Sequence, residues 1–320
     1  MASRVMQTST ANGHTATLVE SSSFEPLTPE ERMAGVERRT LRSHARASWD
    51  AFRRDGAGML CLAFVAFLVL VALCAPALAP HDPYVQNLPA RLTKPCAAYP
   101  LGTDELGRCV LSRVIYGCRV SLSVGLASQA LALVVGFAVG ACAGYLGGRV
   151  DAVASFVIQV FSSFPFLLFA LVVMYALGPG LQNLYVALGL LMWTGTARLV
   201  RGEVMRLKSS EYVLACEVAG GSSRRVIVRH LLPNCLPLLV VTATLGIPNA
   251  ILCEATLSFL GLGVQPPMAS WGQMIAAAQP YVQSSTYYSL APGAAIFATV
   301  MAFNLLGDAV RDAIDPRSHL

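Results

Sequence analysis

The sequence predicts an all-α polytopic membrane protein with about six transmembrane helices, and three observations lead to this fold class. Of the 320 residues, 55% are hydrophobic and only 13% are charged, with a mean hydropathy of +0.58. Several uncharged runs are long enough, at about 1.5 Å per helical residue, to cross a hydrocarbon core of about 30 Å. Basic residues gather in alternate segments between these runs. Because soluble domains carry about 25% charged residues, this chain has too little polarity to cover a water-soluble surface.

The uncharged runs define the expected helices in order. The run between Asp151 and Arg198 is too long for one helix, and Gly178, Pro179 and Gly180 favour a turn within it. We therefore divide that run into a third and a fourth span. The six expected spans are 56–80, the run between Arg119 and Arg149, 152–177, 183–200, the run from Pro233 to about Phe259, and 289–306.

Basic residues set the orientation, because cytoplasmic loops carry an excess of Lys and Arg. They precede the first span, separate the second from the third, cluster between the fourth and fifth, and follow the sixth. Segments 178–183 and 260–288 contain neither Lys nor Arg, whereas the longer first outer loop is an exception to the pattern. We expect a multi-pass protein of the cell inner (cytoplasmic) membrane, in contact with lipid, with both termini in the cytoplasm. The net charge of +5 is modest and does not indicate a nucleic-acid partner.

These features divide the chain into five parts. They are a cytoplasmic N-terminal tail (1–55, partly disordered), a first transmembrane helix (56–80), an extracytoplasmic loop (81–117), a five-helix core (118–310) with a cytoplasmic loop at 201–233, and a cytoplasmic C-terminal tail (311–320). Cys96 and Cys109 fall in the outer loop, where an oxidising compartment would allow a disulfide. The sequence leaves their pairing open, and no Cys or His cluster has the spacing of a metal site.

The stretch EYVLACEVAGGSSRRVIVRHLLPN, residues 211–234, is a polar interruption between two apolar runs. It predicts a short helix that begins at Ser209 or Ser210 and ends at Gly220, followed by a second helical piece that meets the membrane at Pro233. The first helix would either insert into a groove of a partner or lie on the bilayer surface, and these residues alone favour neither. In the first case its exposed residues would be Tyr212, Val213, Ala215 and Val218.

Other classes of function need sequence features that this chain lacks. The segment GEVMRLKS (202–209) approaches a nucleotide-binding P-loop, but Leu207 stands where the second glycine is required. We therefore expect no catalytic residues, no cofactor on this chain and no enzymatic activity. A secondary transporter would carry ionisable residues in mid-span, whereas these spans are nearly free of them, apart from Glu254 near the outer end of the fifth span. Glu254 is either a helix-end acid that reaches the interface or part of an outer gate.

Several stretches together indicate a family. In the cytoplasmic loop, Ala215, Gly220, Leu232 and Pro233 match in register the signature of permease subunits of ATP-binding-cassette importers, while Leu214, Cys216 and His230 depart from it. The segments 101–125, 144–151, 197–204, 254–267, 270–274 and 302–317 resemble the dipeptide/oligopeptide/nickel permease family, and the run LSFLGLGVQPP resembles its second, C-type subunit. The resemblance covers about residues 56–317. Cys109 stands where the family usually has Asp.

The resemblance implies a type I ABC importer permease fold and a set of partners. These partners are a sibling permease, two ATP-binding subunits that hold ATP and Mg, and an extracytoplasmic solute-binding protein. The helix that contains Ala215 would be the coupling helix, and its loop would dock on the ATPase. The docking residues implied are Glu211, Tyr212, Ala215, Gly220, Arg224, Arg225 and Pro233, with Glu254 as a candidate outer gate. The expected cargo is a di- or oligopeptide, with nickel or another small solute as the alternative.

Overall fold

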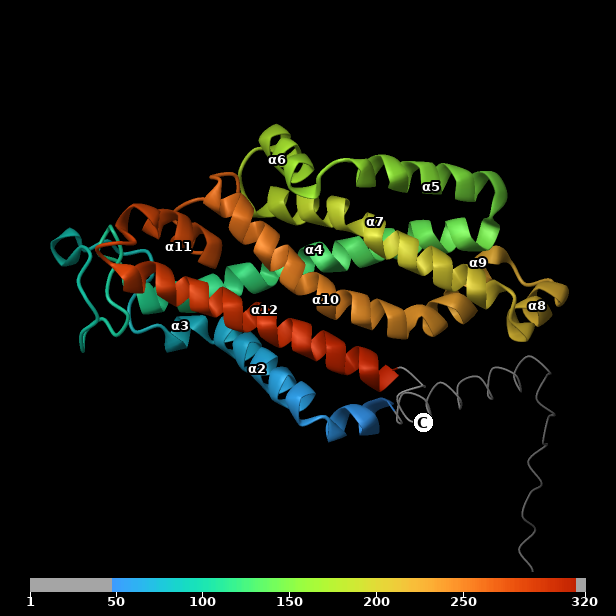
Figure 1. Cartoon of the computed structure of the whole chain (residues 1–320), viewed down its shortest axis with the longest axis horizontal. Coiled ribbons are helices and arrows are strands. Elements are labelled where there is room, and N and C mark those ends of the chain that lie inside the picture. The colour runs from blue at the N-terminus through green and yellow to red at the C-terminus, as the bar shows by residue number, and fades with distance from the viewer. Residues whose placement is uncertain (1–47, 315–320) are drawn as a thin grey trace, which may run out of the picture. The chain divides into compact units, whose positions relative to one another are not determined.

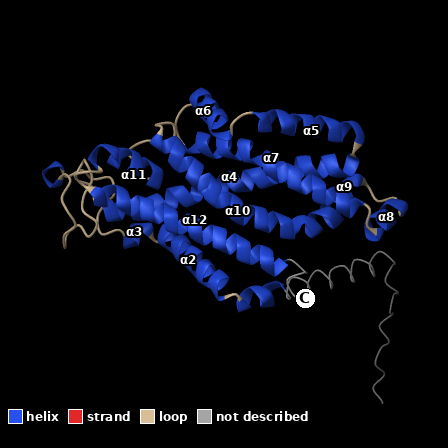
Figure 2. Cartoon of the chain, viewed as in Figure 1, coloured by secondary structure: helices blue, strands red, loops and turns tan. Residues whose placement is uncertain are grey.

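The computed structural model describes residues 48–314, which fold into a helical bundle (Figure 1). Helices account for nearly all regular structure in this part of the chain (Figure 2), as the all-α prediction requires, and the described residues contain no strand beyond one isolated bridge between Thr103 and Cys109. The predicted tails lie largely outside the described residues, although residues 48–54 are helical. The first transmembrane helix, α2, covers Gly56–Leu73 and begins where Asp55 accepts a hydrogen bond from the Ala57 amide at 3.0 Å.

Two predicted boundaries of the outer loop are displaced. Helix α2 ends at Leu73 instead of 80, because Pro76, which has no amide hydrogen, lies in the separate short helix α3 (Ala75–Leu78). Helix α4 (Val110–Leu146) begins inside the segment predicted as loop, and its 37 residues span about 55 Å. It ends at Gly147, whose φ of 66° terminates the helix.

Glycines on α4 allow a close approach to helix α7 (Leu181–Lys208). Gly136, Gly140 and Gly144 recur every fourth residue and face α7, and a Cβ added at Gly140 would lie 2.5 Å from the Ala197 carbonyl oxygen. Small residues at this spacing let two membrane helices pack backbone against backbone. The α4–α7 pair therefore forms the centre around which the other helices are arranged.

The predicted third span, 152–177, is wrong as a single helix. It consists of α5 (Gly148–Ser163) and α6 (Phe166–Leu177), which are bent by 91° relative to each other. Phe164 is extended at the break, because the ring of Pro165 disfavours helical backbone at the preceding residue. Both helices contact α7, and the bend between them makes α6 run across the direction of α5 (Figure 1).

The helix of the predicted fifth span begins before Pro233, and the membrane entry expected at Pro233 stays a prediction. Helix α9 (Ser223–Val226), a π-helical turn η2 (Ile227–Leu231) and α10 (Leu232–Phe259) form one continuous 37-residue span, Ser223–Phe259. A proline removes one backbone hydrogen bond and crowds the preceding turn, and the wider π turn directly before Pro233 accommodates it. The second helical piece of the 201–233 loop is thus continuous with the helix of the fifth span.

The remaining elements close the bundle. Helix α12 (Thr286–Ile314) contacts both α10 and α2, and extends beyond the predicted 289–306. Helix α11 (Trp271–Ala278) packs against α10 and α12 next to the outer loop, which contains the short helix η1 (Leu88–Ala90). A second 3-10 turn, η3 (Gln279–Tyr281), follows α11.

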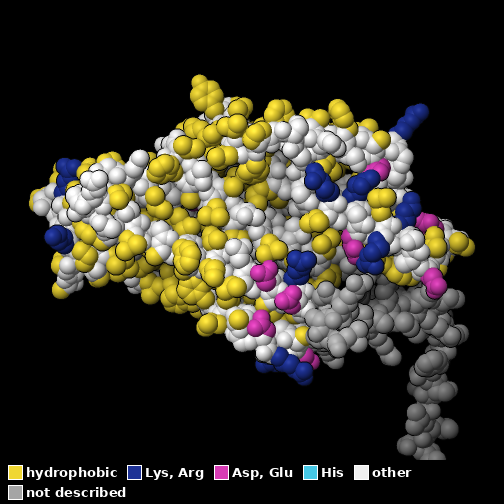
Figure 3. Space-filling model, in the orientation of Figure 1, with side chains coloured by type: hydrophobic (Ala, Val, Ile, Leu, Met, Phe, Trp, Pro, Cys, Tyr) yellow, Lys and Arg dark blue, Asp and Glu magenta, His cyan; other side chains and the backbone are white. Residues whose placement is uncertain are grey.

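The surface is banded as a membrane protein requires. Figure 3 shows hydrophobic side chains over the middle of the visible face and charged ones gathered at the end that carries α8 and α9. By length and composition, four helical spans of the described residues can cross a membrane, or five if bent α5 and α6 form one. Helix α7 has 28 residues but is less apolar than these. The predicted total of six includes α7 and stays a prediction.

Candidate functional site

The predicted docking helix exists as α8, Glu211–Val218. Ser210 is its N-cap residue and has extended backbone, and its carbonyl oxygen accepts hydrogen bonds from the amides of Val213 and Leu214 at 3.1 Å. The Ser210 hydroxyl does not cap the helix but donates to the Leu207 carbonyl at 2.6 Å, which ties the start of α8 to the end of α7. Glu211 lies in the first turn, where the helix dipole favours an acid, and is exposed.

The end of α8 is a rigid glycine cap. The Gly220 amide donates to the Glu217 carbonyl at 3.0 Å, and the Gly221 amide donates to the Cys216 carbonyl at 2.9 Å. With Gly220 at a φ of 78°, this is the Schellman pattern, so the prediction of a left-handed cap at Gly220 is confirmed. Gly221 has a separate reason to be glycine, because a Cβ there would lie 2.6 Å from the Cys216 sulfur.

The exposed face of α8 differs from the predicted one. Val213 is fully buried in a hydrophobic cluster with residues of α4, α7 and α10, and Tyr212 packs against the same cluster. Ala215 is half-buried. The outward residues are Leu214 and Val218, whose exposed fractions are 48% and 91%. Since they are four residues apart, they lie on one face of the helix and form an apolar ridge.

Tyr145, at the end of α4, connects this loop to the spans. Lys208, the last residue of α7, donates to the Tyr145 carbonyl at 2.7 Å, and its ammonium lies 5.5 Å from the centre of the Tyr145 ring. The Tyr145 side chain also interacts with Glu217 of α8 and Ser223 of α9. The contact role of Tyr145 could not be predicted, because no local pattern links this residue to a loop more than sixty positions further along the chain.

The remaining predicted docking residues lie beyond the glycine cap. Ser222 caps α9 by accepting a hydrogen bond from the Arg225 amide at 3.4 Å. Arg224 and Arg225 are exposed on this first turn, where their charges add to the charged end of the bundle that carries α8 and α9. Pro233 is half-buried inside the continuous helix Ser223–Phe259, and its part in docking stays a prediction.

Glu254 does not reach an interface. It is fully buried in α10, where the hydroxyls of Ser258 and Ser121 donate to its carboxylate at 2.7 and 3.3 Å, and Ser270 also interacts with it. The interpretation of a helix-end acid exposed at the surface is therefore wrong. These contacts join α10 to α4 and to the segment before α11, and the gate role of Glu254 stays a prediction.

The outer loop is held by buried charges. Arg108 donates to Asp104 at 2.6 Å, and Arg113 lies 3.4 Å from the same carboxylate while donating to Gln273 of α11 at 3.0 Å. Cys96 is exposed and Cys109 is buried at the start of α4, and both are free thiols, so the structure does not contain a bond between them. Among residues 48–314, no three His, Cys, Asp or Glu side chains form a group able to hold a metal ion.

The described residues thus form a helical membrane domain whose charged end carries a short, capped helix with an apolar ridge. Residues 136–319 match the family described as binding-protein-dependent transport system inner membrane component, and residues 43–95 match the N-terminal transmembrane domain of oligopeptide transport permease C. The chain belongs to the family of binding-protein-dependent transport system inner membrane components. It is a multi-pass membrane permease component of an ABC transporter.

Several curated relatives cover most of the chain. It is 39% identical over 289 residues to the dipeptide transport system permease protein DppC of Bacillus subtilis, with 90% of each chain covered. It is 36% identical to the oligopeptide transport system permease protein OppC of the same organism, with 83% of this chain and 87% of the relative covered. It is 43% identical to the nickel transport system permease protein NikC of Escherichia coli K12, with 80% and 93% covered.

A solved structure shares the fold. The chain resembles a chain of the MetNI methionine ABC transporter in an inward-facing conformation, with a TM-score of 0.52 and 19% identity. The match covers 63% of this chain and 96% of the other. The fold of an ABC importer permease is therefore shared at low sequence identity.

Proposed function

We propose that this chain is one of two permease subunits of an ABC importer that carries di- or oligopeptides across the inner membrane. The observation that carries the proposal is the apolar ridge of α8, formed by Leu214 and Val218, on a helix whose opposite face is buried in the bundle. Leu214 and Val218 present neighbouring apolar side chains at the charged end of the bundle, and a groove on an ATPase subunit would cover both. The relatives named for dipeptide and oligopeptide transport support the cargo class.

In this proposal the ATP and Mg bind to two separate ATPase subunits, and this chain has no nucleotide site of its own. Closure of the ATPase pair moves α8. The Schellman cap and the buried Val213 make α8 move as a unit, because a loose loop would absorb the displacement. Tyr145 and Lys208 pass that displacement to the ends of α4 and α7, the most closely packed pair in the bundle.

The remaining partners follow from the same proposal. A sibling permease completes the pathway, and an extracytoplasmic binding protein delivers the solute to the side that carries α11 and the outer loop. Both termini then lie in the cytoplasm. Glu254, which joins α4, α10 and the segment before α11, is placed to transmit opening at this outer side.

Co-purification in mild detergent tests the assembly. The proposal predicts that a tagged chain retains a P-loop ATPase and a second permease, and that the assembly hydrolyses ATP faster when the loaded binding protein is added. Mass spectrometry of the ligand released from that binding protein identifies the cargo. A peptide supports the proposal, whereas nickel would support the alternative, for which the 43% identity to a nickel permease is the specific observation.

A further inference from the structure

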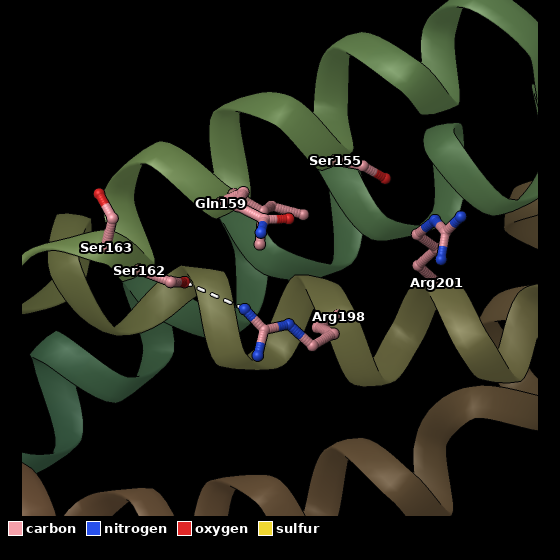
Figure 4. Close-up of a pocket in the computed structure, with 7 residues that line it drawn as sticks. Ser155, Gln159, Ser162, Ser163, Arg198 and Arg201 are labelled. Atoms are coloured by element: carbon pink, nitrogen blue, oxygen red, sulfur yellow. Dashed lines mark hydrogen bonds between the residues drawn. The ribbon is translucent and has the colours of Figure 1, made fainter.

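A polar cleft lies between α5 and α7, where membrane helices would ordinarily meet through apolar side chains. Its volume is about 520 Å³. Ser155, Gln159 and Ser162 recur on α5 at intervals of four and three residues, so they share one face, and this face lines the cleft. The opposite wall comes from α7 and contributes Arg198 and Arg201 (Figure 4).

The two arginines of the cleft differ in their neutralisation. Arg201 forms an ion pair with Asp151, with a second bond from its Nη2 to Oδ2 at 2.7 Å. Arg198 donates to the hydroxyl of Ser162 at 3.1 Å, and no Asp or Glu among residues 48–314 forms an ion pair with it. Figure 4 shows the Arg198 guanidinium directed along the cleft toward Ser162. The cleft therefore combines one uncompensated positive charge with neutral hydrogen-bonding groups.

Arg198 lies near the end of the predicted fourth span, 183–200, because it follows Leu181, the start of α7, by seventeen residues, or about 26 Å along the helix. A charged side chain at the end of a span faces protein or water. On the same face of α7, a Cβ at Gly195 or Gly202 would meet no atom within 4 Å, so the space on both sides of Arg198 is open.

The break between α5 and α6 gives a second, independent indication. Ser163, Phe164 and Pro165 are exposed where the chain bends by 91°, and Ser163 also lines the cleft. Non-helical backbone within a membrane is tolerated only where protein covers it or where it lines a water-filled space. Since a polar, charged cleft opens at this break, water is the covering that the geometry favours.

We infer that this cleft is an anion-binding station on the solute route, where Arg198 binds the terminal carboxylate of the cargo with the help of Gln159 and Ser162. The inference rests on the proposed peptide cargo. A guanidinium matches a carboxylate through two parallel hydrogen bonds, and the Gln159 amide and Ser162 hydroxyl supply further donors. Arg198, Gln159 and Ser162 are all exposed, which keeps binding weak, as a station that must release its ligand requires. A lipid phosphate offers the same chemistry and is distinguished by experiment.

The first test uses the complete importer in proteoliposomes with a tripeptide and its C-terminal amide, chosen so that the binding protein takes up both equally. Arg198→Gln is expected to lower import of the free acid about tenfold, the loss of roughly one charge-assisted hydrogen bond, and import of the amide less than twofold. Arg198→Lys keeps the charge and is expected to restore part of the difference. Arg149→Gln, an exposed arginine at the start of α5, is the matched control and should change neither rate. Equal losses for acid and amide would overturn the inference.

The second test does not depend on peptide import. Gln159→Cys is treated with an anionic and a cationic methanethiosulfonate, with the wild-type chain and its own cysteines as background. The anionic reagent is expected to react several-fold faster, and Arg198→Gln should remove that preference. If Gln159→Cys is labelled no more than the wild-type chain, or if the two reagents react at equal rates while Arg198 is present, the inference of an anion-binding station is overturned. If the wild type imports no peptide but the charge preference holds, the proposed function fails while the anion site stands. Phospholipid could instead co-purify stoichiometrically with the wild-type importer and be lost in Arg198→Gln, while the acid and the amide are imported at equal rates. That result would assign the site to lipid and overturn the inference.

Discussion

The exposed ridge of α8 leads to a quantitative prediction about docking. Val218 exposes 91% of its surface in this chain, so nearly all of its side chain is available for burial by a partner. Val218→Ala removes two methyl-sized groups at about 0.8 kcal/mol each, or about 1.6 kcal/mol in total. Because about 1.4 kcal/mol corresponds to tenfold in Kd, the ATPase should bind roughly fifteenfold more weakly. Val218→Asp also places a charge in the interface, and its loss should exceed a hundredfold, or about 2.7 kcal/mol.

The assay is titration of the purified ATPase subunit onto the permease complex in nanodiscs, with binding-protein-stimulated ATP hydrolysis as a second readout. Val134→Ala is the matched control, since Val134 is 68% exposed but lies in the middle of α4, far in sequence from the loop. Thermal stability should be unchanged in all three variants, because neither valine is buried in the bundle. Wild-type affinity in Val218→Asp would refute the docking role of this ridge and favour a helix that lies on the bilayer surface.

Three further predictions concern the cap, the buried acid and the topology. Gly220→Val should reduce import by displacing the end of α8, because the φ of 78° at this position is strained for a β-branched residue. Gly220→Asn should retain import, since Asn tolerates this backbone region. Equal import by both variants would contradict the cap argument. Glu254→Leu should lower the free energy of unfolding by about 1–3 kcal/mol for each buried hydroxyl left without its acceptor. The measurement is the Tm in detergent, which should fall. An unchanged Tm would mean that these hydrogen bonds do not stabilise the fold. Cysteine at the exposed positions Gln283 and Ser222 should be labelled by a membrane-impermeant reagent from outside and from inside respectively, and outside labelling of Ser222→Cys would reverse the orientation.

Local chemistry explains why parts of the fold were predictable. Uncharged runs identify membrane helices because an unpaired charge in hydrocarbon is costly wherever the helix goes, and the segments that became α2, α4, α10 and α12 were found in this way. The ends of α8 were predictable for a similar reason, since capping depends on residues within one turn. Ser210 therefore occupies the predicted N-cap position, although its hydroxyl does not cap the helix, and Gly220 occupies the left-handed position that glycine adopts without strain.

Long-range packing decided the rest. The face of α8 that is buried could not be inferred, because Val213, Leu214 and Val218 are all apolar and only neighbours from α4, α7 and α10 select Val213 for the core. The same holds for Tyr145, Glu254 and Arg198, whose partners lie in other helices. The sequence by itself determined which segments form long apolar helices, apart from the bend between α5 and α6, because this property depends on composition along the chain. The tertiary structure alone decided which side chains meet, because such contacts depend on the relative positions of whole helices.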